Sequence, residues 1–585
     1  MCTRCDTPSM RAVAFIDAAI CSCRRRSGSD VDAWRRVGRQ ALRALTPAWL
    51  LVGRTSAAAF AAGAVLQAPT IPAVTRDAIE GLEPAALWEH FAALSSIPRP
   101  SGREEAALNF IKRFAESKNL VWKEDDAGNL CVFRPGTGVG GSASPVIIQG
   151  HVDMVTEKNS DTAHDFNSDP ILMRRFVKDD RNWIGAQGTT LGADNGMGVA
   201  AALSLLGIDP NEEGGKPLPP IQALFTVDEE TGLHGAAKLD AEALGLTGKT
   251  MLNLDMEEWG DLFVGCAGGG DSNVEIPIKR NISILGEEVF DLMEVRVDGL
   301  MGGHSGLNIA EGRGNGVLLC ATATKVALEA AGPGKAALIS MSGGDKHNAI
   351  PREASAIIAV LSTAATKERI KNSIRAAASA AVDEFGLLEK GLRIQAKEID
   401  DSDLYDSPPL DEESATRLLS SLLALPHGPI KFSHALPGLV ETSNNVASVS
   451  VGVGSAKVLC SSRSSIGSAL ENTRDRIKAV AFLAGGNVAQ SKAYPGWAPN
   501  PRSCILDVSK RLLEERLGHE AGVKAVHAGL ECGLLIEKLG EDIDVISFGP
   551  TIEGAHSPDE RVDSNTVAPF FEFVQDILAD YATRI

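Results

Sequence analysis

Residues 145–155, PVIIQGHVDMV, begin as an apolar, β-branched run and become polar at their end. An apolar run without alternation is typical of a parallel strand that is buried on both faces. The polar end of such a strand leads into the loop region where α/β proteins place their ligand sites. The stretch therefore predicts a parallel sheet, with functional side chains at the carboxyl end of this strand.

Three later stretches share this arrangement, in which an apolar strand or helix adjoins a polar or glycine-rich loop. They are TLGADNGMGVAAALSLLG at 190–207, IQALFTVDEETG at 221–232 and KTMLNLDMEEWG at 249–260. Strands that alternate with helices at this spacing favour an α/β sheet with parallel strands. We therefore expect an α/β fold for this part of the chain.

The chain of 585 residues is too long for one ordinary hydrophobic core, so we expect more than one domain. The α/β pattern changes near FVGCAGGG at 263–270 and resumes with AYPGWAPNP at 493–501. Strand-like and helix-like stretches are mixed between them, and no internal repeat is evident. We predict an α/β domain in two parts, 77–268 and 493–585, with an α+β domain inserted at 269–492.

Residues 1–76 differ in composition from the rest of the chain. They hold 11 Arg, no Lys and 4 acids, a formal charge of 11 − 4 = +7. An Arg-rich, acid-poor leader is typical of an organelle transit peptide, but an extension without a targeting role has the same composition. We expect a disordered or cleaved leader and a location in the cytoplasm or in an organelle.

Charge and hydropathy exclude two classes of partner. The formal net charge of −19 argues against a nucleic-acid partner, because a phosphate backbone requires a basic surface. The moderately apolar stretch at 48–68 is interrupted by Arg54, which makes it a weak candidate for a membrane-spanning helix. We expect neither nucleic acid nor a membrane as a partner.

Metal-ligand residue types recur where the expected strands end. Each group alone is more often structural than functional, but independent structural groups would not all fall at strand-to-loop junctions. The residues are His151, Asp153, Asp194, Asp228, Glu229, Glu230, Asp255 and His556. Two histidines with several carboxylates form a ligand set that zinc accepts.

This set is large enough for two metal ions if one carboxylate bridges them. A metal pair acts as a clamp for hydrolysis, because it polarises a carbonyl and activates water near neutral pH. Glu229 and Glu230 are adjacent, so one can bind metal while the other acts as a general base. The residues therefore predict a metal-dependent hydrolase.

Nine motifs together resemble the aminoacyl-histidine dipeptidases of the M20 metallopeptidase family. They are GHVDMV, TTLGADNGMGVA, TVDEETGLHGA, LNLDMEEWGDLFVGCAGG, GGHSG, GRGNG, HNAIPREA, HAGLECG and ISFGPTIEGAHSPDER. The resemblance runs from about residue 80 to the end of the chain and leaves out the leader. It implies a phosphorylase/hydrolase-like zinc peptidase domain, with an inserted α+β lid or dimerisation domain and a homodimer as the assembly.

The resemblance also implies two zinc ions per chain, for which Mn²⁺ or Co²⁺ could substitute. His151 and Asp255 would hold one ion, Glu230 and His556 would hold the other, and Asp194 would bridge them. We expect each of these five residues to be a metal ligand.

Three further residues would act in catalysis if the resemblance holds. Asp153 would orient His151 through the second ring nitrogen. Glu229 would take a proton from the attacking water and pass it to the leaving amine. His304, in the inserted domain, would meet the substrate carbonyl or carboxylate; a structural turn histidine is the alternative.

Four residues of the inserted domain are candidates for substrate binding. Arg463 suits the C-terminal carboxylate of a peptide because a guanidinium binds carboxylates in a bidentate manner, although a surface arginine would also fit this sequence. Asn348, Glu441 and Asn444 lie in the motifs HNAIPREA and VETSNN and are weaker candidates.

We therefore predict metal-dependent hydrolysis of a small peptide, either Xaa-His dipeptides or dipeptides more broadly. One alternative is an aminoacylase-like amidohydrolase of the same family that acts on N-acyl amino acids. Another is a non-catalytic metal-binding relative, which the presence of Asp153 and Glu229 disfavours.

Overall fold

The computed structural model describes residues 69–209, 215–281, 289–400 and 408–584. The predicted leader therefore lies outside the described residues up to position 68. The folded unit begins at Pro69, eight residues before the expected boundary at 77 (77 − 69 = 8). Helix α3 (Ala73–Ile79) belongs to this unit, since Thr75 is buried and its hydroxyl accepts a hydrogen bond of 3.2 Å from the amide of Met173.

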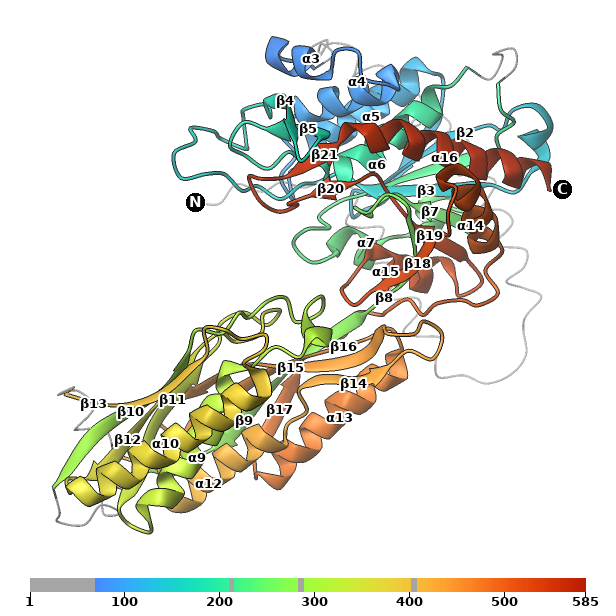
Figure 1. Ribbon diagram of the computed structural model, residues 1–585. Helices are drawn as coiled ribbons and strands as arrows, with labels where there is room; N and C mark the ends of the chain where they lie inside the picture. Colours follow the sequence, from blue (N-terminus) through green and yellow to red (C-terminus); the bar gives the residue numbers. More distant parts are fainter. Residues whose placement is uncertain (1–68, 210–214, 282–288, 401–407, 585) are drawn as a thin grey trace, which may run out of the picture. The chain divides into compact units, whose positions relative to one another are not determined.

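An eight-stranded sheet forms the centre of the first domain (Figure 1). Its spatial order is β1 (Val121–Glu124), β2 (Leu130–Arg134), β6 (Ile221–Thr226), β3 (Val146–His151), β7 (Thr250–Asn253), β19 (Asp544–Ser547), β8 (Asp261–Cys266) and β18 (Gly522–Val526). The four central strands β6, β3, β7 and β19 are parallel. All six residues of β3 and all six of β6 are buried, as their apolar runs predict.

Helices cover this sheet and join the two halves of the domain. They are α4 (Ala85–Ser95), α5 (Glu105–Ser117), α6 (Ala193–Gly207), α14 (Cys504–Leu517), α15 (Glu531–Leu539) and α16 (Ser564–Thr583). Helix α6 packs on β3 and α4, whereas α14 packs on β19 and α16. A small sheet of β20 (Ile552–Glu553), β21 (Arg561–Asp563), β5 (Arg181–Ala186) and β4 (Met173–Lys178) also joins the two halves.

The inserted segment forms its own nine-stranded sheet. Its strands are β9 (Gly268–Pro277), β10 (Phe290–Asp298), β11 (Ala336–Gly343), β12 (Ala354–Leu361), β13 (Arg393–Ile399), β14 (Gly428–Phe432), β15 (Val440–Val451), β16 (Ser455–Ser464) and β17 (Asn487–Gln490). Figure 1 shows four helices together on one face of this sheet, α9 (Gly316–Ala331), α10 (Ala364–Phe385), α12 (Glu412–Ala424) and α13 (Gly467–Leu483). Its buried apolar residues form a cluster separate from that of the first domain.

The inserted sheet contains a topological repeat that the sequence does not reveal. One unit runs β10–α9–β11–β12–α10–β13 and has the strand order β13-β10-β12-β11. The other consists of β9, which precedes the first unit in the chain, and of α12, β15, β16, α13 and β17, which follow it. It has the equivalent order β17-β9-β16-β15, and β14, between α12 and β15 in the chain, is added beside β15. The two units join through their equivalent strands β11 and β15, which pair antiparallel. Many alternating sequences fit such strands, so the repeat leaves no sequence signal that we detected.

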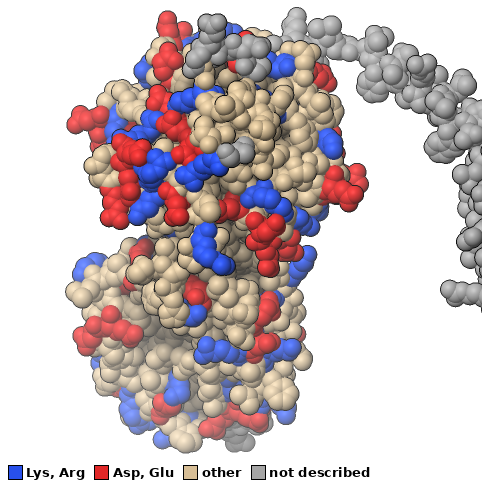
Figure 2. Space-filling view, turned by 90° about the vertical axis from the view of Figure 1, so that its right-hand side faces the viewer, with Lys and Arg blue, Asp and Glu red and all other residues tan. Residues whose placement is uncertain are grey.

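Acidic and basic side chains are interspersed on the face of the molecule that Figure 2 shows. Among the described residues, no helix combines the length and apolarity that crossing a membrane would need.

Candidate metal centre

The five expected metal ligands converge at the carboxyl ends of the central parallel strands. His151 is the last residue of β3, and Asp255 follows β7 by two positions. Glu230 follows β6, Asp194 lies in the first turn of α6, and His556 follows β20. Parallel strands end at a common edge of the sheet, which is why residues so far apart in the chain meet here.

Asp194 lies between the two histidines. Its Oδ1 is 3.1 Å from Nε2 of His151, and its Oδ2 is 3.2 Å from Nε2 of His556. On the first side, His151 Nε2 is also 3.3 Å from Oδ1 of Asp255. On the second side, His556 Nε2 is 3.0 Å from Oε2 of Glu230. The five side chains therefore form two groups that share one carboxylate.

The donor set and its spacing fit divalent ions. Tetrahedral zinc with bonds of about 2.0–2.1 Å sets neighbouring ligand atoms about 3.3 Å apart, close to the separations above. Glu230 Oε1 and Asp255 Oδ1 are buried and accept no hydrogen bond within the part of the chain that the structure describes, although Asp255 Oδ1 keeps its 3.3 Å contact with His151 Nε2. Buried carboxylate oxygens rarely stay unpaired, so a bound cation would account for both.

The pKa values of the two histidines also support a cation site. Hydrogen bonds that His556 donates to the carboxylates of Asp194 and Glu230 raise its pKa to about 11. Burial alone would lower the pKa of His151, but Asp255, Asp153 and Asp194 outweigh burial and raise it well above the usual value. Carboxylates that attract a proton this strongly also attract a metal cation, which would displace the proton.

Asp153 links the first histidine to the acidic loop. Its side chain is fully buried, with Oδ1 at 3.4 Å from Nδ1 of His151. It also accepts hydrogen bonds from the amides of Glu229 (3.1 Å) and Glu230 (3.2 Å) and from the hydroxyl of Ser101 (2.7 Å). Burial opposes its ionisation, yet the ring of His151, followed by the hydrogen bonds from Ser101 and the amide of Glu229, lowers its pKa to about 2. Asp153 therefore holds the backbone of the acid pair by hydrogen bonds and lies within 3.4 Å of the His151 ring.

Glu229 lines the same cavity as the ligands. Burial is the main reason that its pKa lies well above the ordinary value. The charge of His151 opposes this shift, and the carboxylates of Asp255 and Glu531 add to it. A carboxyl group with a raised pKa beside a metal centre is suited to accept and return a proton.

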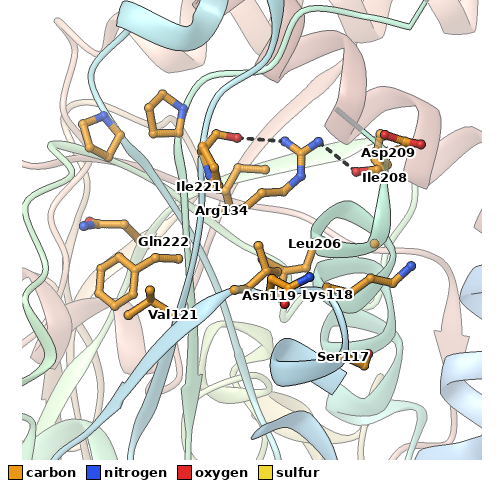
Figure 3. Close-up of a pocket in the computed structure, with 16 residues that line it drawn as sticks. Ser117, Lys118, Asn119, Val121, Arg134, Leu206, Ile208, Asp209, Ile221 and Gln222 are labelled. Carbon is orange, nitrogen blue, oxygen red and sulfur yellow. Dashed lines mark hydrogen bonds between the residues drawn. The ribbon is translucent and has the colours of Figure 1, made fainter. Parts of the chain in front are cut away.

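A large cavity lies at each end of the parallel strands, and the residues that line the two cavities differ. The first, of about 700 Å³, is lined by ligand residues that include His151, Asp194 and His556. The second, of about 730 Å³, lies where β3 and β6 begin (Figure 3). There, Arg134 donates to the backbone carbonyls of Pro135 (3.3 Å) and Ile208 (3.1 Å). Its guanidinium is therefore already engaged, and we place the functional site at the first cavity.

His304 and Arg463 belong to the inserted domain. His304 Nδ1 accepts from the amides of Gly306 (3.2 Å) and Leu307 (3.1 Å), so in the neutral ring Nε2 carries the proton. Burial, helped by the charge of Arg463, lowers the pKa of His304 to about 4. Leu307, in the same loop, lines the cavity of the metal ligands. His304 is thus a neutral hydrogen-bond donor beside that cavity.

Arg463 lies on β16 and is 6% exposed. Its Nη1 donates to the hydroxyl of Tyr494 (3.2 Å), while its Nε is buried and makes no hydrogen bond to any described residue. An arginine with unused donors is suited to bind an anionic group of a ligand.

The other three substrate-binding candidates are engaged elsewhere or exposed. Asn444 is fully buried and bonds internally, to the carbonyl of Pro426 (2.6 Å) and the hydroxyl of Ser462 (2.8 Å). Glu441 forms an ion pair of 2.8 Å with Lys431. Asn348 is exposed, and its backbone carbonyl accepts from the amide of Ser305 (2.8 Å), next to His304.

Glu560 has a supporting role that the sequence analysis did not assign. Its carboxylate accepts four backbone amides, those of Leu191 (2.7 Å), Gly192 (2.9 Å), Ala193 (2.7 Å) and Asp194 (3.2 Å). It therefore fixes the loop that carries the shared carboxylate. The only sequence signal was its place in the motif ISFGPTIEGAHSPDER.

Arg99 is a second residue of this kind, and it is 1% exposed. Its guanidinium donates to the carbonyls of Val152 (2.7 Å), Asp153 (3.0 Å) and Gly192 (2.6 Å). It thus ties the loop after β3 to the loop before α6. In the sequence, Arg99 stands in a Pro-rich turn, which gave no hint of this role.

Known proteins share both the sequence and the fold. A sequence profile described as Peptidase family M20/M25/M40 matches residues 147–580. The cytosol non-specific dipeptidase of Escherichia coli (strain K12) is 36% identical over 509 residues, covering 86% of this chain and 99% of that protein. The crystal structure of aminoacylhistidine dipeptidase from Vibrio alginolyticus matches with 34% identity and a TM-score of 0.74, covering 86% and 98% of the two chains. A tripeptidase from Staphylococcus aureus, 16% identical with a TM-score of 0.51 over 86% and 100% of the chains, shares the fold.

Proposed function

Because the chain belongs to the M20 family of peptidases, we propose that it hydrolyses dipeptides with a pair of zinc ions. The observation that carries the proposal is Asp194, which lies within 3.1 Å of His151 and 3.2 Å of His556. One carboxylate shared by two histidine-containing groups is the arrangement that a two-metal site needs. The dipeptidases of Escherichia coli and Vibrio alginolyticus, at 36% and 34% identity, supply the substrate class.

His151, Asp255 and Asp194 would hold one ion, and Glu230, His556 and Asp194 the other. When bound, the two ions supply the Lewis acidity that polarises the scissile carbonyl and lowers the pKa of water towards neutrality. Mn²⁺ or Co²⁺ would fit the same nitrogen and oxygen ligands.

The residues around the metal ligands would manage the proton and the substrate. Glu229 accepts the proton of the attacking water and returns it to the leaving amine. Asp153 fixes the ring of His151 through Nδ1. His304 offers its Nε2–H to the oxyanion that forms from the carbonyl, and Arg463 binds the C-terminal carboxylate.

The preferred substrate separates our proposal from the alternative within the family. A site that binds both the free amine and the carboxylate of a dipeptide would discriminate against longer peptides. An aminoacylase-like enzyme would instead accept N-acyl amino acids. We propose dipeptides, with Xaa-His among them, because both high-identity relatives are named dipeptidases.

The test uses the full chain, stripped of metal by a chelator and reloaded with Zn²⁺, Mn²⁺ or Co²⁺. Hydrolysis of an Xaa-His dipeptide and a non-histidine dipeptide is compared with that of a tetrapeptide and an N-acetyl amino acid. We expect metal-dependent turnover of dipeptides and much slower turnover of the other two. Faster cleavage of the N-acetyl amino acid would support the aminoacylase alternative. Metal binding without any turnover would support a non-catalytic relative.

A further inference from the structure

A ladder of buried polar side chains crosses the four central strands beneath the metal ligands. It contains Thr226 on β6, Gln149 on β3, Asn253 on β7 and Ser547 on β19, and it ends on Glu531, the first residue of α15. None of these five residues is more than 1% exposed. We call this group the polar ladder.

Short hydrogen bonds join the members of the polar ladder. The hydroxyl of Ser547 donates to Oδ1 of Asn253, and Nδ2 of Asn253 donates to Oε1 of Gln149 (2.5 Å). Nε2 of Gln149 donates to Oε2 of Glu531 (2.6 Å) and to the hydroxyl oxygen of Thr226 (3.1 Å). The hydroxyl of Thr226 in turn donates to the same oxygen of Glu531 (2.6 Å).

The strand register sets Gln149 and Asn253 one pleat below the metal ligands, whereas Thr226 is the cross-strand neighbour of His151. Gln149 precedes His151 by two positions, and Asn253 precedes Asp255 by two. On an extended strand, residues two apart point to the same side. Gln149 is the cross-strand neighbour of Asn253, and Asn253 is the neighbour of Ser547. The ladder therefore links the two strand ends that carry His151 and Asp255.

Glu531 determines which side-chain atoms of the polar ladder donate hydrogen bonds and which accept them. An ionised carboxylate only accepts hydrogen bonds, whereas an amide can present either its oxygen or its nitrogen. The amide of Gln149 must turn its nitrogen to Glu531 and its oxygen to Asn253, and this in turn orients the amide of Asn253. Burial raises the pKa of Glu531 to about 7, while the charge of His151 and the hydrogen bond from Thr226 favour the ionised form.

A buried carboxylate is costly to retain for packing alone. An apolar side chain of similar volume would fill this space without the desolvation penalty. The second oxygen of Glu531 is buried and has no hydrogen-bond partner among the described residues, so its polar contacts serve only the ladder.

We propose that Glu531 is a positioning residue, which fixes the strand ends of His151 and Asp255 through Gln149 and Asn253 and so sets the affinity for the metal ion that these two ligands hold. The inference rests on the metal assignment of the proposed function. His556 lies on a segment outside the polar ladder. Glu230 lies four positions beyond Thr226, in a loop where its amide is held by Asp153. The ion that these two residues hold therefore depends on Glu531 less.

The test measures metal binding rather than turnover. Dissociation constants for Zn²⁺ are determined by competition with a chromophoric chelator for the full-length protein and its Glu531→Gln variant. The amide oxygen of the variant can still accept from Gln149 and Thr226, but it carries no charge, so these bonds weaken. The amide nitrogen then takes the place of the buried Oε1, where no described residue offers an acceptor. We expect one of the two ions to bind at least about 10-fold more weakly, while the affinity for the other changes little. The Co²⁺ absorption spectrum of the weakened site should change as well, because its ligand geometry changes.

Glu389→Gln is the matched control. Glu389 is 2% exposed and accepts the amides of Met301 (2.7 Å) and Gly314 (3.0 Å) in the inserted domain. The same substitution there removes a buried acceptor that has no link to the ladder. We expect lower stability but both zinc affinities of the wild type.

The outcomes separate the inference from the proposed function. If the wild type binds two ions and Glu531→Gln binds both equally well, the role of Glu531 is refuted. If the wild type binds no metal, the proposed function itself fails. Should Glu531→Gln not fold, Thr226→Val decides: it removes one donor to Glu531 at almost constant volume, and it must weaken the same single ion.

Discussion

Oδ2 of Asp194 lies 3.2 Å from Nε2 of His556. His556 adopts a φ of 61°, a left-handed conformation that residues other than glycine seldom use. Such conformations persist where the surroundings impose them, and they concentrate at functional sites. We therefore expect the site to be most sensitive to substitution at Asp194 and His556.

Asp194→Asn should abolish the metal pair. The amide keeps one acceptor oxygen, so it cannot serve both groups as a carboxylate does. We expect fewer than two zinc ions per chain by elemental analysis and an activity at least about 100-fold lower. Two tightly bound ions in this variant would show that Asp194 does not bridge.

Glu229→Gln should separate chemistry from metal binding. The amide has nearly the same shape but cannot accept the proton of the attacking water. We expect kcat to fall by about 10²- to 10⁴-fold while the zinc content stays at the wild-type level. The control is Glu537→Gln, the same change at an exposed position of α15. Wild-type kcat in Glu229→Gln would place the general base elsewhere.

Arg463→Ala should weaken recognition of the substrate carboxylate. Loss of a charge-assisted hydrogen bond is worth about 1.5–3 kcal/mol, so KM for a dipeptide should rise by about 10- to 100-fold. A C-terminally amidated dipeptide serves as the internal control, because it has no carboxylate to lose. Equal KM increases for both substrates would mean that Arg463 acts on packing alone.

Glu560→Gln should destabilise the loop that carries Asp194. The variant replaces one acceptor oxygen by a donor that faces backbone amides, at a cost of about 1–3 kcal/mol. Urea denaturation of the metal-free protein measures this loss. Glu572→Gln is the matched control on α16, where the carboxylate makes only an exposed ion pair with Arg516 and should contribute less than about 1 kcal/mol. Equal effects in the two variants would contradict the role of Glu560.

Acidification should destabilise the protein through its neutral, buried histidines. Burial lowers the pKa of His90 and of His427 to about 4, from an ordinary value near 6.5. Between pH 6.5 and 4 the unfolded chain binds protons at these positions and the folded chain does not. Each of these two histidines therefore lowers the stability as pH falls, by up to about 1.4 kcal/mol per pH unit, whereas the raised pKa values of His151 and His556 act in the opposite direction.

Thermal unfolding in chelator at pH 7 and pH 5 measures this effect. His90→Gln removes one of the two groups, so its melting temperature should fall less than that of the wild type over the same interval. An equal fall would show that His90 is protonated in the folded state.

Besides the roles of the site residues and the identity of the metals, the assembly and the leader stay predictions. The homodimer that the resemblance implies requires a measurement of mass in solution. The targeting role of the leader concerns residues that lie mostly outside the described part of the chain.

The sequence by itself determined the α/β fold and the membership of the M20 family. Both depend on local patterns, namely the buried apolar runs of β3 and β6 and the ligand-type residues that follow them. Burial of a strand on both faces can be predicted from the residues of that strand alone, because an apolar run without alternation is typical of it. For the same reason, the residue types at the strand ends predicted a metal-dependent hydrolase before any contact was known.

Only the tertiary structure decided which atoms meet. His556 and Asp194 are 362 positions apart, and Glu531 lies 382 positions from Gln149. Such contacts arise when strands pair in register and loops pack, and no local pattern records them. The same holds for Glu560, which accepts four hydrogen bonds from backbone amides. Any non-proline residue carries such an amide, so no residue type in the sequence marks these partners. The sequence therefore predicted the chemistry of the site, whereas the tertiary packing determined which residues hold the site in place.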